Sequence, residues 1–437
     1  MRNRWARRAA VCLVAVPLAV LAFTSTGSGA TRSASAACSA SGSISFDGVW
    51  TGAEATAFGA VIKAFNKVCP KVKVNYKPVG DNLPTVVSTA VAGGNPPDMA
   101  DIAQPGLVAQ FVAKGALKPI TYARTVLLAN FSPSWIALGT FQKKVYGLVF
   151  KASNKSTVWY NVTAFKNAGV TPPATWPQLL KDASTIKASG TPAFSIGGAD
   201  GWTLTDLFEN IYLRQAGPVK YALLTAHKIK WTDSTVAAAL KTMAQVIGDS
   251  ANMAGGTSGA VQTDFPTSVN NVWESPPKAA IVLEGDFVPG VQTVKAKPSD
   301  YGEFPFPSIN NSPPEVEIGG DTIVTFRDKP QIEAFVKFLA TPAAAAAWAA
   351  KGGFATGNKH MPASVYPDAI TRATASAIAK AKYVVFDMSD QQPASFGATV
   401  GQGEWGLFQN FLRNPSDVSG IQSQLESAAA AAWKSGK

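Results

Sequence analysis

The first half of the chain alternates between strand-like and helix-like patterns of hydrophobic residues. Residues 43–49 form a short β-rich run, and residues 58–68 repeat apolar side chains every three or four positions, which predicts an amphipathic helix. Residues 71–77 alternate apolar and polar side chains, as a strand with one solvated face does. With a helix over 83–92 and a strand over 98–103, the β-α-β-α-β order predicts a mostly parallel sheet with helices on both faces.

The second half of the chain repeats this alternation. Asp233 is a candidate N-cap for a helix that stops at Gly248. The short apolar runs 279–283 and 322–326 are typical of central strands buried on both faces. The other predicted elements are strands over 145–150, 157–160 and 193–196, and helices over 106–114, 176–188, 402–412 and 418–433. The predicted fold class is therefore α/β.

Length and composition limit the possible classes of protein. At roughly 150 residues per domain, 437 residues predict two or three domains. Hydrophobic residues make up 46% and charged residues 15%, which excludes a coiled coil and a wholly disordered chain. Two His and three Cys are too few for a Cys/His zinc site, so we expect no metal. The sequence also has no Walker-type loop for nucleotide phosphates and no nucleophile elbow of a hydrolase. We expect no cofactor.

Residues 1–37 have the order of a secretory signal. A basic start with four arginines is followed by an apolar stretch over 9–23 and a run of small residues. The apolar stretch is shorter than the roughly 20 residues that span a bilayer. We therefore expect a secreted or extracellular protein whose mature part begins near residue 38.

The charge of the mature chain does not point to nucleic acid. The formal net charge is +11, and it falls to +6 without the five arginines of residues 1–37. The remaining Lys and Arg residues are scattered, whereas a nucleic-acid surface would carry a basic stripe with aromatic residues between. We expect no nucleic-acid partner.

Two cysteines, Cys38 and Cys69, remain in the mature chain, each just before a predicted strand. If the two strands are parallel neighbours, their beginnings are close enough for a disulfide, which an oxidising compartment favours. The alternative is lipid attachment at Cys38, although the residues before it, Ser35-Ala36-Ala37, lack the expected Leu.

Tryptophans beside polar groups are the first candidate chemistry. Trp50 precedes Glu54 by four residues, Trp202 precedes Asp206 by four, and Trp405 follows Glu404. A sugar has apolar C–H faces and a rim of hydroxyls, so an aromatic ring with a nearby carboxylate or amide suits it. The alternative for each ring is packing in the core, which we assign to three others, Trp176, Trp348 and Trp433.

A second candidate is the helix that begins at residue 201. One of its faces would carry Trp202, Asp206, Glu209 and Asn210, and the opposite face is apolar. An aromatic ring with two acids suits hydroxyl binding. The alternative is that acids near a helix start only complement the helix dipole on a solvated face.

A third candidate is Glu284-Gly285-Asp286-Phe287, two acids and an aromatic residue directly after a buried-type strand. Ligands of open α/β sheets lie beyond the carboxyl ends of the strands. The alternative is an ordinary glycine turn with solvated acids. Two acids could also form a glycosidase pair, which would require a separation of about 5.5 Å or about 6.5–9.5 Å between carboxyl groups.

Taken together, these residues resemble the family 1 extracellular solute-binding proteins of sugar ABC importers, which include maltose-binding proteins. Within that family the chain looks most like a branch that binds α-glucosides or oligosaccharides. The segments that carry the resemblance are Gly93-Gly94-Asn95-Pro96-Pro97-Asp98, Ala103-Gln104-Pro105-Gly106, Val158-Trp159-Tyr160-Asn161, Gly285-Asp286, Gly319-Gly320-Asp321, Gly352-Gly353-Phe354 and Gly401-Gln402-Gly403-Glu404-Trp405.

The resemblance implies a two-lobed α/β fold with the ligand in a cleft between discontinuous lobes joined by hinge crossovers. The first lobe would comprise 38–153 and 304–350, and the second 154–303 and 351–437. The crossovers would lie near 151–156, 303–306 and 346–357.

The resemblance also implies the ligand-binding residues. The first lobe would contribute Trp50, Glu54, Asn82 and Gln104. The second lobe would contribute Trp202, Asp206, Glu209, Glu284, Asp286 and Trp405. Asp321 and Phe354 would lie near the hinge.

The implied function is that of a transport receptor and not of an enzyme. A carbohydrate would bind in the cleft, and the closed protein, a monomer, would dock on the permease subunits of an ABC transporter outside the cell membrane. Two alternatives remain open: a solute-binding protein for a polyamine, phosphodiester or peptide, and a secreted glycoside hydrolase. The poor lipid-attachment motif and Cys69 depart from the family pattern.

Overall fold

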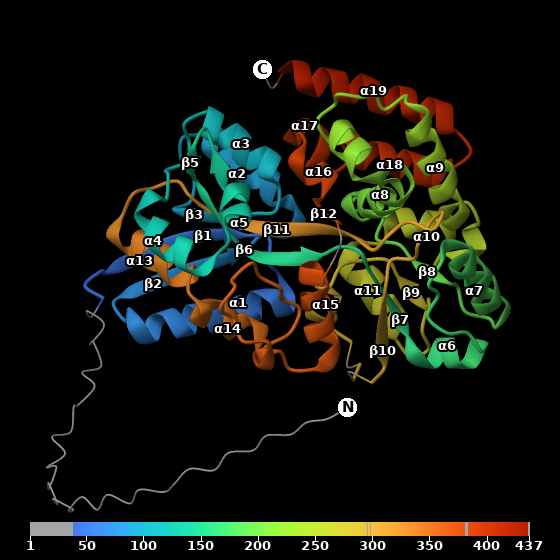
Figure 1. The fold of residues 1–437 in the computed structure, drawn as a ribbon, viewed down its shortest axis with the longest axis horizontal. Helices are drawn as coiled ribbons and strands as arrows, with labels where there is room; N and C mark the ends of the chain where they lie inside the picture. Colours follow the sequence, from blue (N-terminus) through green and yellow to red (C-terminus); the bar gives the residue numbers. More distant parts are fainter. Residues whose placement is uncertain (1–37, 295, 298, 381–382, 436–437) are drawn as a thin grey trace, which may run out of the picture. The chain divides into compact units, whose positions relative to one another are not determined.

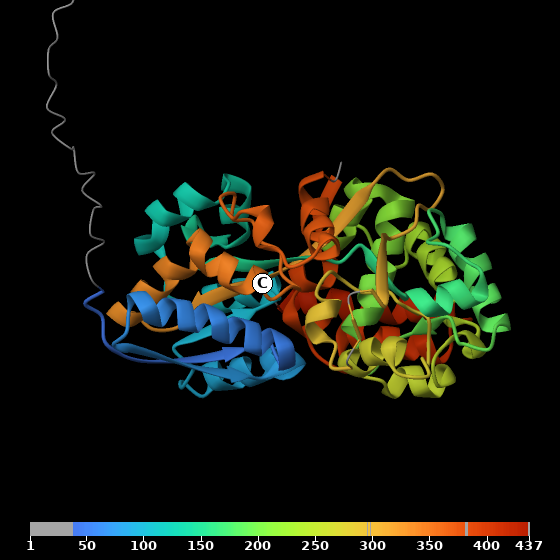
Figure 2. The same ribbon diagram turned by 90° about the horizontal axis from the view of Figure 1, so that it is seen from below.

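The computed structural model describes residues 38–435 except 295, 298, 381 and 382, and the predicted signal over 1–37 lies outside the described residues. The described chain is built around two main sheets, each with its own helices (Figures 1 and 2). We call the part around the six-stranded sheet the first lobe and the part around the four-stranded sheet the second lobe. The two-lobed α/β fold expected from the sequence is confirmed.

The sheet of the first lobe has the order β12-β11-β3-β1-β2, and β6 also pairs with β11. Its strands are β1 (Gly42–Gly48), β2 (Val72–Pro78), β3 (Met99–Ile102), β6 (Gly147–Asn154), β11 (Glu315–Thr325) and β12 (Tyr383–Phe386). The predicted parallel arrangement holds for β2-β1-β3. It does not hold for β11, which runs antiparallel to β3 and β6 because it enters this sheet from the second lobe.

Helices cover this sheet, and their apolar faces form its core. In α1, for example, Phe58, Val61 and Phe65 are buried at the predicted helical spacing. The first-lobe helices are α1 (Gly52–Val68), α2 (Leu83–Ala92), α3 (Pro105–Ala113), α4 (Arg124–Asn130), α5 (Pro133–Leu138), α13 (Pro330–Leu339) and α14 (Pro342–Ala349). A short hairpin is formed by β4 (Thr140–Phe141) and β5 (Lys144–Val145).

The sheet of the second lobe has the order β10-β7-β9-β8. Its strands are β7 (Thr157–Asn161), β8 (Phe194–Ser195), β9 (Ile281–Val282) and β10 (Tyr301–Pro305). Its helices are α6 (Val162–Ala168), α7 (Trp176–Ala188), α8 (Trp202–Thr225), α9 (Ser234–Ile247), α10 (Gly256–Gln262), α11 (Phe265–Trp273), α12 (Val288–Val291), α16 (Met388–Gln391), α17 (Ala394–Gly397), α18 (Gly403–Arg413) and α19 (Val418–Ser435). The predicted cap of α9 is present, since the Asp233 side chain accepts a hydrogen bond from Thr235 N.

The chain passes between the lobes at the ends of long strands. Strand β6 of the first lobe leads into β7 of the second, and β11 returns from the end of β10. Helix α15 (Ala369–Lys380) packs on β6 and β11.

Two stretches pack differently from the predicted lobe boundaries. Phe304, Phe306 and Ile309 are part of the second-lobe core, although the boundary at 304 assigned them to the first lobe. Phe354 and Tyr366 are buried in the first-lobe core, although the boundary at 351 assigned them to the second. We propose that two of the crossovers lie after Ile309 and after β12, because apolar side chains hold residues 304–309 in the second-lobe core and residues 354–366 in the first-lobe core.

The structure joins Cys38 and Cys69 in a disulfide, with 5.1 Å between their Cα atoms. The two strands that follow these cysteines, β1 and β2, are parallel neighbours with Gly42 opposite Val72.

Among the described residues, no single helix is long and apolar enough to cross a membrane. The pair α13 and α14 reaches that length and composition only when both helices are taken together across a bend of 67°. Ile332, Phe335 and Trp348 of this pair are buried in the first-lobe core.

Candidate functional site

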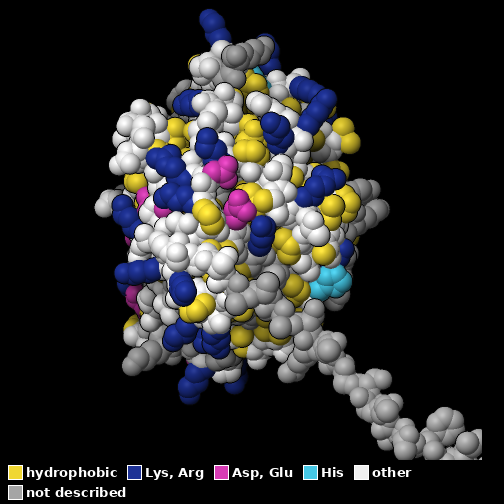
Figure 3. Space-filling model, turned by 90° about the vertical axis from the view of Figure 1, so that its left-hand side faces the viewer, with side chains coloured by type: hydrophobic (Ala, Val, Ile, Leu, Met, Phe, Trp, Pro, Cys, Tyr) yellow, Lys and Arg dark blue, Asp and Glu magenta, His cyan; other side chains and the backbone are white. Residues whose placement is uncertain are grey.

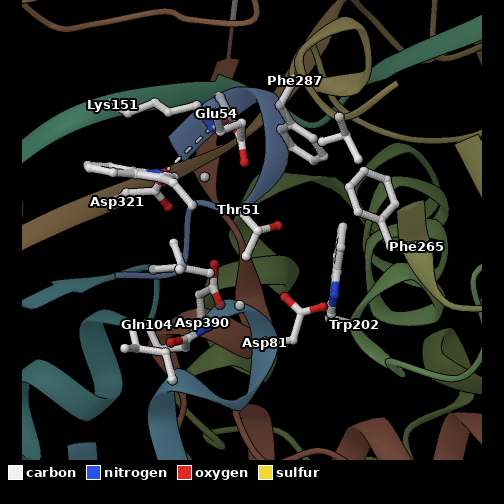
Figure 4. Close-up of a pocket in the computed structure, with 18 of the residues that line it drawn as sticks. Thr51, Glu54, Asp81, Gln104, Lys151, Trp202, Phe265, Phe287, Asp321 and Asp390 are labelled. Atoms are coloured by element: carbon white, nitrogen blue, oxygen red, sulfur yellow. Dashed lines mark hydrogen bonds and ion pairs between the residues drawn. The ribbon is translucent and has the colours of Figure 1, made fainter. Parts of the chain in front are cut away.

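A cavity lies where the two lobes meet, and helix N-termini from both lobes surround it (Figure 4). The start of α1 and the start of α3 contribute from the first lobe, and the starts of α8, α11 and α18 contribute from the second. The space available to the centres of water-sized spheres is about 140 Å³. The polar and aromatic side chains that line the cavity are Trp50, Thr51, Glu54, Asp81, Gln104, Lys151, Ser153, Lys155, Trp202, Phe265, Phe287, Asp321, Asp390 and Trp405.

One wall of the cavity is a network of charged groups from the first lobe. The ammonium of Lys151 lies 3.0 Å from the Glu54 carboxylate and 3.6 Å from the Asp321 carboxylate. The indole nitrogen of Trp50 donates a hydrogen bond of 2.6 Å to Asp321. Burial lowers the pKa of Lys151, but Glu54 and Asp321 outweigh this effect and raise that pKa above its ordinary value, so the lysine keeps its charge.

The opposite wall consists of three aromatic rings from the second lobe. The ring centroids of Trp202 and Phe265 are 4.8 Å apart, and those of Phe265 and Phe287 are 5.5 Å apart, both in edge-to-face contact. Figure 4 shows these three rings on one side of the cavity, facing Thr51 and Glu54. Such a wall offers an apolar face to the C–H groups of a ligand.

The glycine before Trp202 lets the start of α8 approach α18. Gly201 has φ of 85°, and a Cβ atom at this position would lie 2.6 Å from the Cβ atom of Trp405. A larger residue would therefore separate Trp405 from the start of α8. This contact brings Trp202 and Trp405 to the same cavity, although they are 203 residues apart in sequence.

Lys155, which lines the cavity, is also the centre of a buried ionic cluster that extends behind the lining. Its ammonium lies 3.1 Å from Asp206, 3.8 Å from Asp390 and in hydrogen-bond contact with Asp387, and it lies 5.4 Å from the ring centre of Trp202. Burial opposes the charge of Asp387, but Lys155 and several hydrogen bonds lower the pKa of Asp387 below its ordinary value. One ammonium cannot compensate three carboxylates, and burial and Asp387 raise the pKa of Asp390 well above its ordinary value.

The carboxylates of this cluster also meet a geometric criterion for a metal site. Asp206, Glu317 and Asp387 each place one oxygen within 4.8 Å of the others, and all three are buried. The ammonium of Lys155 lies against Asp206 and Asp387, so a cation of the chain itself already pairs with two of these three carboxylates.

Asp81 and Gln104 complete the cavity on the first-lobe side. Asp81 is in the 3₁₀ turn before α2, and its carboxylate lies beside the Trp202 indole (Figure 4). No ion pair joins Asp81 to a Lys or Arg among the described residues, in contrast to Glu54, Asp321 and Asp390. Burial raises the pKa of Asp81.

Half of the predicted site residues line the cavity. These are Trp50, Glu54, Gln104, Trp202, Asp321 and Trp405. Of these, Trp50 is only 1% exposed and packs edge-to-face on Trp348, so it mainly holds Asp321 in place.

The other six predicted site residues do not line it. Asn82 is exposed, and its neighbour Asp81 points into the cavity instead. Asp206 lies in the Lys155 cluster, and Glu209 accepts hydrogen bonds from Tyr221 and from the backbone at the start of α16. Phe354 stacks on Trp348 in the first-lobe core.

Glu284 and Asp286 are each 3% exposed and lie beneath the lining. Burial and the carboxylate of Asp206 raise the pKa of Glu284. Burial raises the pKa of Asp286 to about 7, although Lys151 works in the opposite direction. These acids follow β9, as the sequence predicted, but both are buried and neither lines the cavity.

Sequence reasoning missed several lining residues. Lys151 and Lys155 resembled scattered surface lysines, and Phe265 resembled a core residue; of the third candidate cluster, Phe287 lines the cavity and the two acids do not. The available signal was their position. Lys151 lies within β6 and Lys155 directly after it, where the chain passes to the second lobe, and Phe265 directly follows the helix cap Asp264.

Figure 3 shows no basic stripe on the face that it presents, which is the left-hand side of the molecule in Figure 1. Lys and Arg side chains are spread over that face of the described residues among hydrophobic and other polar side chains. This distribution agrees with the scattered basic residues of the sequence.

Comparison with known proteins agrees with the two-lobed fold. Residues 50–346 match the family of bacterial extracellular solute-binding proteins. The chain is 29% identical over 399 residues to the alpha-glucosides-binding periplasmic protein AglE of Rhizobium meliloti, covering 87% of this chain and 86% of the relative. It is 29% identical over 333 residues to the osmoprotective compounds-binding protein GgtB of Synechocystis sp., covering 75% and 79% of the two chains.

Among solved structures, the chain is similar to the bacterial solute receptor AcbH, which is described as having an exclusive preference for β-D-galactopyranose. The TM-score is 0.79 at 20% identity, over 90% of this chain and 99% of the receptor. The family match covers more than half of the chain and the relatives are binding proteins rather than enzymes. The chain therefore belongs to the family of bacterial extracellular solute-binding proteins.

Proposed function

We propose that this protein captures a carbohydrate, an α-glucoside or a short oligosaccharide, in the cavity between its lobes and delivers it to the permease of an ABC transporter. The observation that carries the proposal is the pairing of an aromatic wall with a wall of hydrogen-bond acceptors. Trp202, Phe265 and Phe287 face Thr51 and Glu54 across the cavity, and the Asp81 carboxylate lies beside Trp202.

This pairing suits a polyol because the lining has many acceptors and few free donors. Ionised carboxylates only accept hydrogen bonds, and the two lysine ammoniums are already engaged with carboxylates. A ligand must then supply donors, as sugar hydroxyls do. A phosphodiester would supply only further acceptors and negative charge, and would find both lysines occupied.

The mechanism we propose is closure of the lobes on the ligand. The cavity draws its walls from both lobes, so a ligand that contacts both walls stabilises the closed arrangement over an open one. The crossovers beside β6 and β11 are the segments where a hinge would bend. The closed form would then dock on the permease.

The location follows from the same proposal. The signal over 1–37 would direct secretion, and the receptor would act as a monomer at the outer face of the cell membrane. Because the Cys38 sulfur is in a disulfide, we propose that no lipid is attached there. Mass spectrometry of the mature N-terminus tests this, since a diacylglyceryl adduct on Cys38 would contradict it.

Isothermal titration calorimetry tests the proposal. The panel should contain glucose, galactose, maltose, trehalose, sucrose and raffinose, with spermidine as the competing ligand class. We expect one-to-one binding of at least one carbohydrate. Binding of spermidine without any carbohydrate would replace the proposal with a polyamine receptor, and turnover of a chromogenic glycoside would replace it with a hydrolase.

A further inference from the structure

The cavity has more carboxylates than ammonium groups. Its lining contains Glu54, Asp81, Asp321 and Asp390 but only Lys151 and Lys155. Behind the lining, Lys155 is shared further with Asp206 and Asp387. The lining therefore holds more acidic groups than ammonium groups at the site where a ligand would lie.

Among the acidic groups of the lining, Asp81 is the one without an ammonium in ion-pair contact. The other three lining carboxylates each have an ammonium within 3.8 Å, at Lys151 or Lys155. Asp81 has no ion-pair partner among the described residues. Burial raises the pKa of Asp81, although the adjacent Trp202 side chain and Lys155 both work in the opposite direction. Figure 4 shows its carboxylate directed into the cavity beside the Trp202 ring.

This position combines two features that attract a cation. An ionised carboxylate forms charge-assisted hydrogen bonds with an ammonium group, and these are stronger than its bonds with a neutral hydroxyl. A neighbouring aromatic face attracts the same group through its quadrupole. Lys155 already uses the Trp202 ring in this way, at 5.4 Å from its centre, while its own charge is neutralised by Asp387 and Asp206.

We propose that the cavity is selective for a sugar that carries a protonated amine in place of one hydroxyl, with the amine at Asp81 beside Trp202. This inference rests on the proposed function, because the remainder of the ligand would be held as a carbohydrate. The amine would supply the charge that the lining lacks, and the rest of the ring would contact the aromatic wall and the acceptors of the first lobe.

Calorimetric titration of matched ligands at about pH 6, where a sugar amine is protonated, tests the inference. Each neutral sugar of the panel is compared with its amino counterpart, for example glucose with glucosamine, galactose with galactosamine and trehalose with trehalosamine. N-acetylglucosamine keeps the nitrogen but removes the charge. We expect the amino sugar to bind about tenfold tighter or more than its neutral and acetylated partners.

The Asp81→Asn variant identifies the group responsible. We expect the ratio of the two dissociation constants to fall toward one, whatever happens to the absolute affinities. Asp328→Asn, which removes the same charge at an exposed position outside the lining, should leave the ratio unchanged. Circular dichroism of both variants confirms that they are folded.

The outcomes distinguish a failure of the amine selectivity from a failure of the proposed sugar-receptor function. Neutral sugars that bind as tightly as their amino partners, or a ratio that Asp81→Asn leaves intact, would overturn the amine selectivity and leave the sugar receptor standing. Binding of spermidine alone, or of no ligand in the panel, would overturn both.

Discussion

Loss of the Lys155 ammonium should destabilise this protein far more than loss of an exposed lysine. The side chain of Lys155 is 10% exposed, and its carboxylate partners Asp206, Asp387 and Asp390 are 2%, 0% and 7% exposed. Removing one partner of a buried ion pair leaves an uncompensated buried charge, which costs about 3–5 kcal/mol. We therefore expect the free energy of unfolding of Lys155→Ala to fall by that amount.

The same loss of unfolding free energy can be expressed as a fall in melting temperature. With an unfolding entropy of about 2.1 cal/mol/K per residue over roughly 400 residues, a loss of 3–5 kcal/mol corresponds to about 4–6 °C. Differential scanning calorimetry at neutral pH measures it. The matched control is Lys187→Ala, because Lys187 pairs with Asp249 at the surface, with side chains 35% and 44% exposed. An exposed pair of this kind contributes about 0–1 kcal/mol.

A second substitution tests whether uncompensated charge is the cause. Asp387→Asn added to Lys155→Ala removes one of the orphaned carboxylates, so it should restore part of the lost stability. If Lys155→Ala lowered the melting temperature no more than Lys187→Ala, the interpretation of Lys155 as the compensating charge of this cluster would be refuted. The same would hold if the double variant were less stable than Lys155→Ala alone.

Three further predictions concern the ligand, pH and the disulfide. Trp202→Ala should weaken carbohydrate binding by about 1–3 kcal/mol in calorimetric titration, whereas Trp433→Ala, on α19 outside the lining, should not; equal affinities would assign Trp202 to packing. Burial raises the pKa of Asp286 to about 7, above its unfolded value of about 3.9, so its contribution to stability is complete below pH ~4 and is lost as the pH rises to about 7. Urea unfolding across this range should show a smaller decline for Asp286→Asn than for the wild type, and parallel curves would contradict this assignment. Replacing Cys38 and Cys69 together by Ser should lower stability by about 3–4 kcal/mol, given their separation of 31 residues, and a loss below about 1 kcal/mol would argue against the pairing.

The regular elements could be predicted largely from the sequence. The helix bounds 83–92 and 176–188 agree with α2 and α7, because Gly93 and the Ser189-Gly190 turn end the two periodic patterns. The direction of β11 could not be predicted. Its apolar pattern indicates a buried strand in either direction, and only the return of the chain from the second lobe makes it antiparallel to β3.

The candidate site was predictable only in part. Trp202 and Glu54 could be found because an aromatic ring and an acid at a helix start form a recognisable pattern. Asp206 and Glu209 share a helix face with Trp202, but they lie one and two turns farther along α8, where they contact Lys155 and the α16 backbone instead of the cavity. A single-residue shift in a 3₁₀ turn decides that Asp81 and not Asn82 lines the cavity.

The central claim is that a carbohydrate binds between the two lobes and contacts both. Hydrogen exchange measured by mass spectrometry, with and without a carbohydrate that calorimetry shows to bind, tests it most directly. We predict slower exchange in segments of both lobes at once, around Thr51–Glu54 and Asp81 in the first lobe and around Trp202 and Phe265 in the second. Protection confined to one lobe, or protection only of segments outside the cavity lining, would contradict the claim.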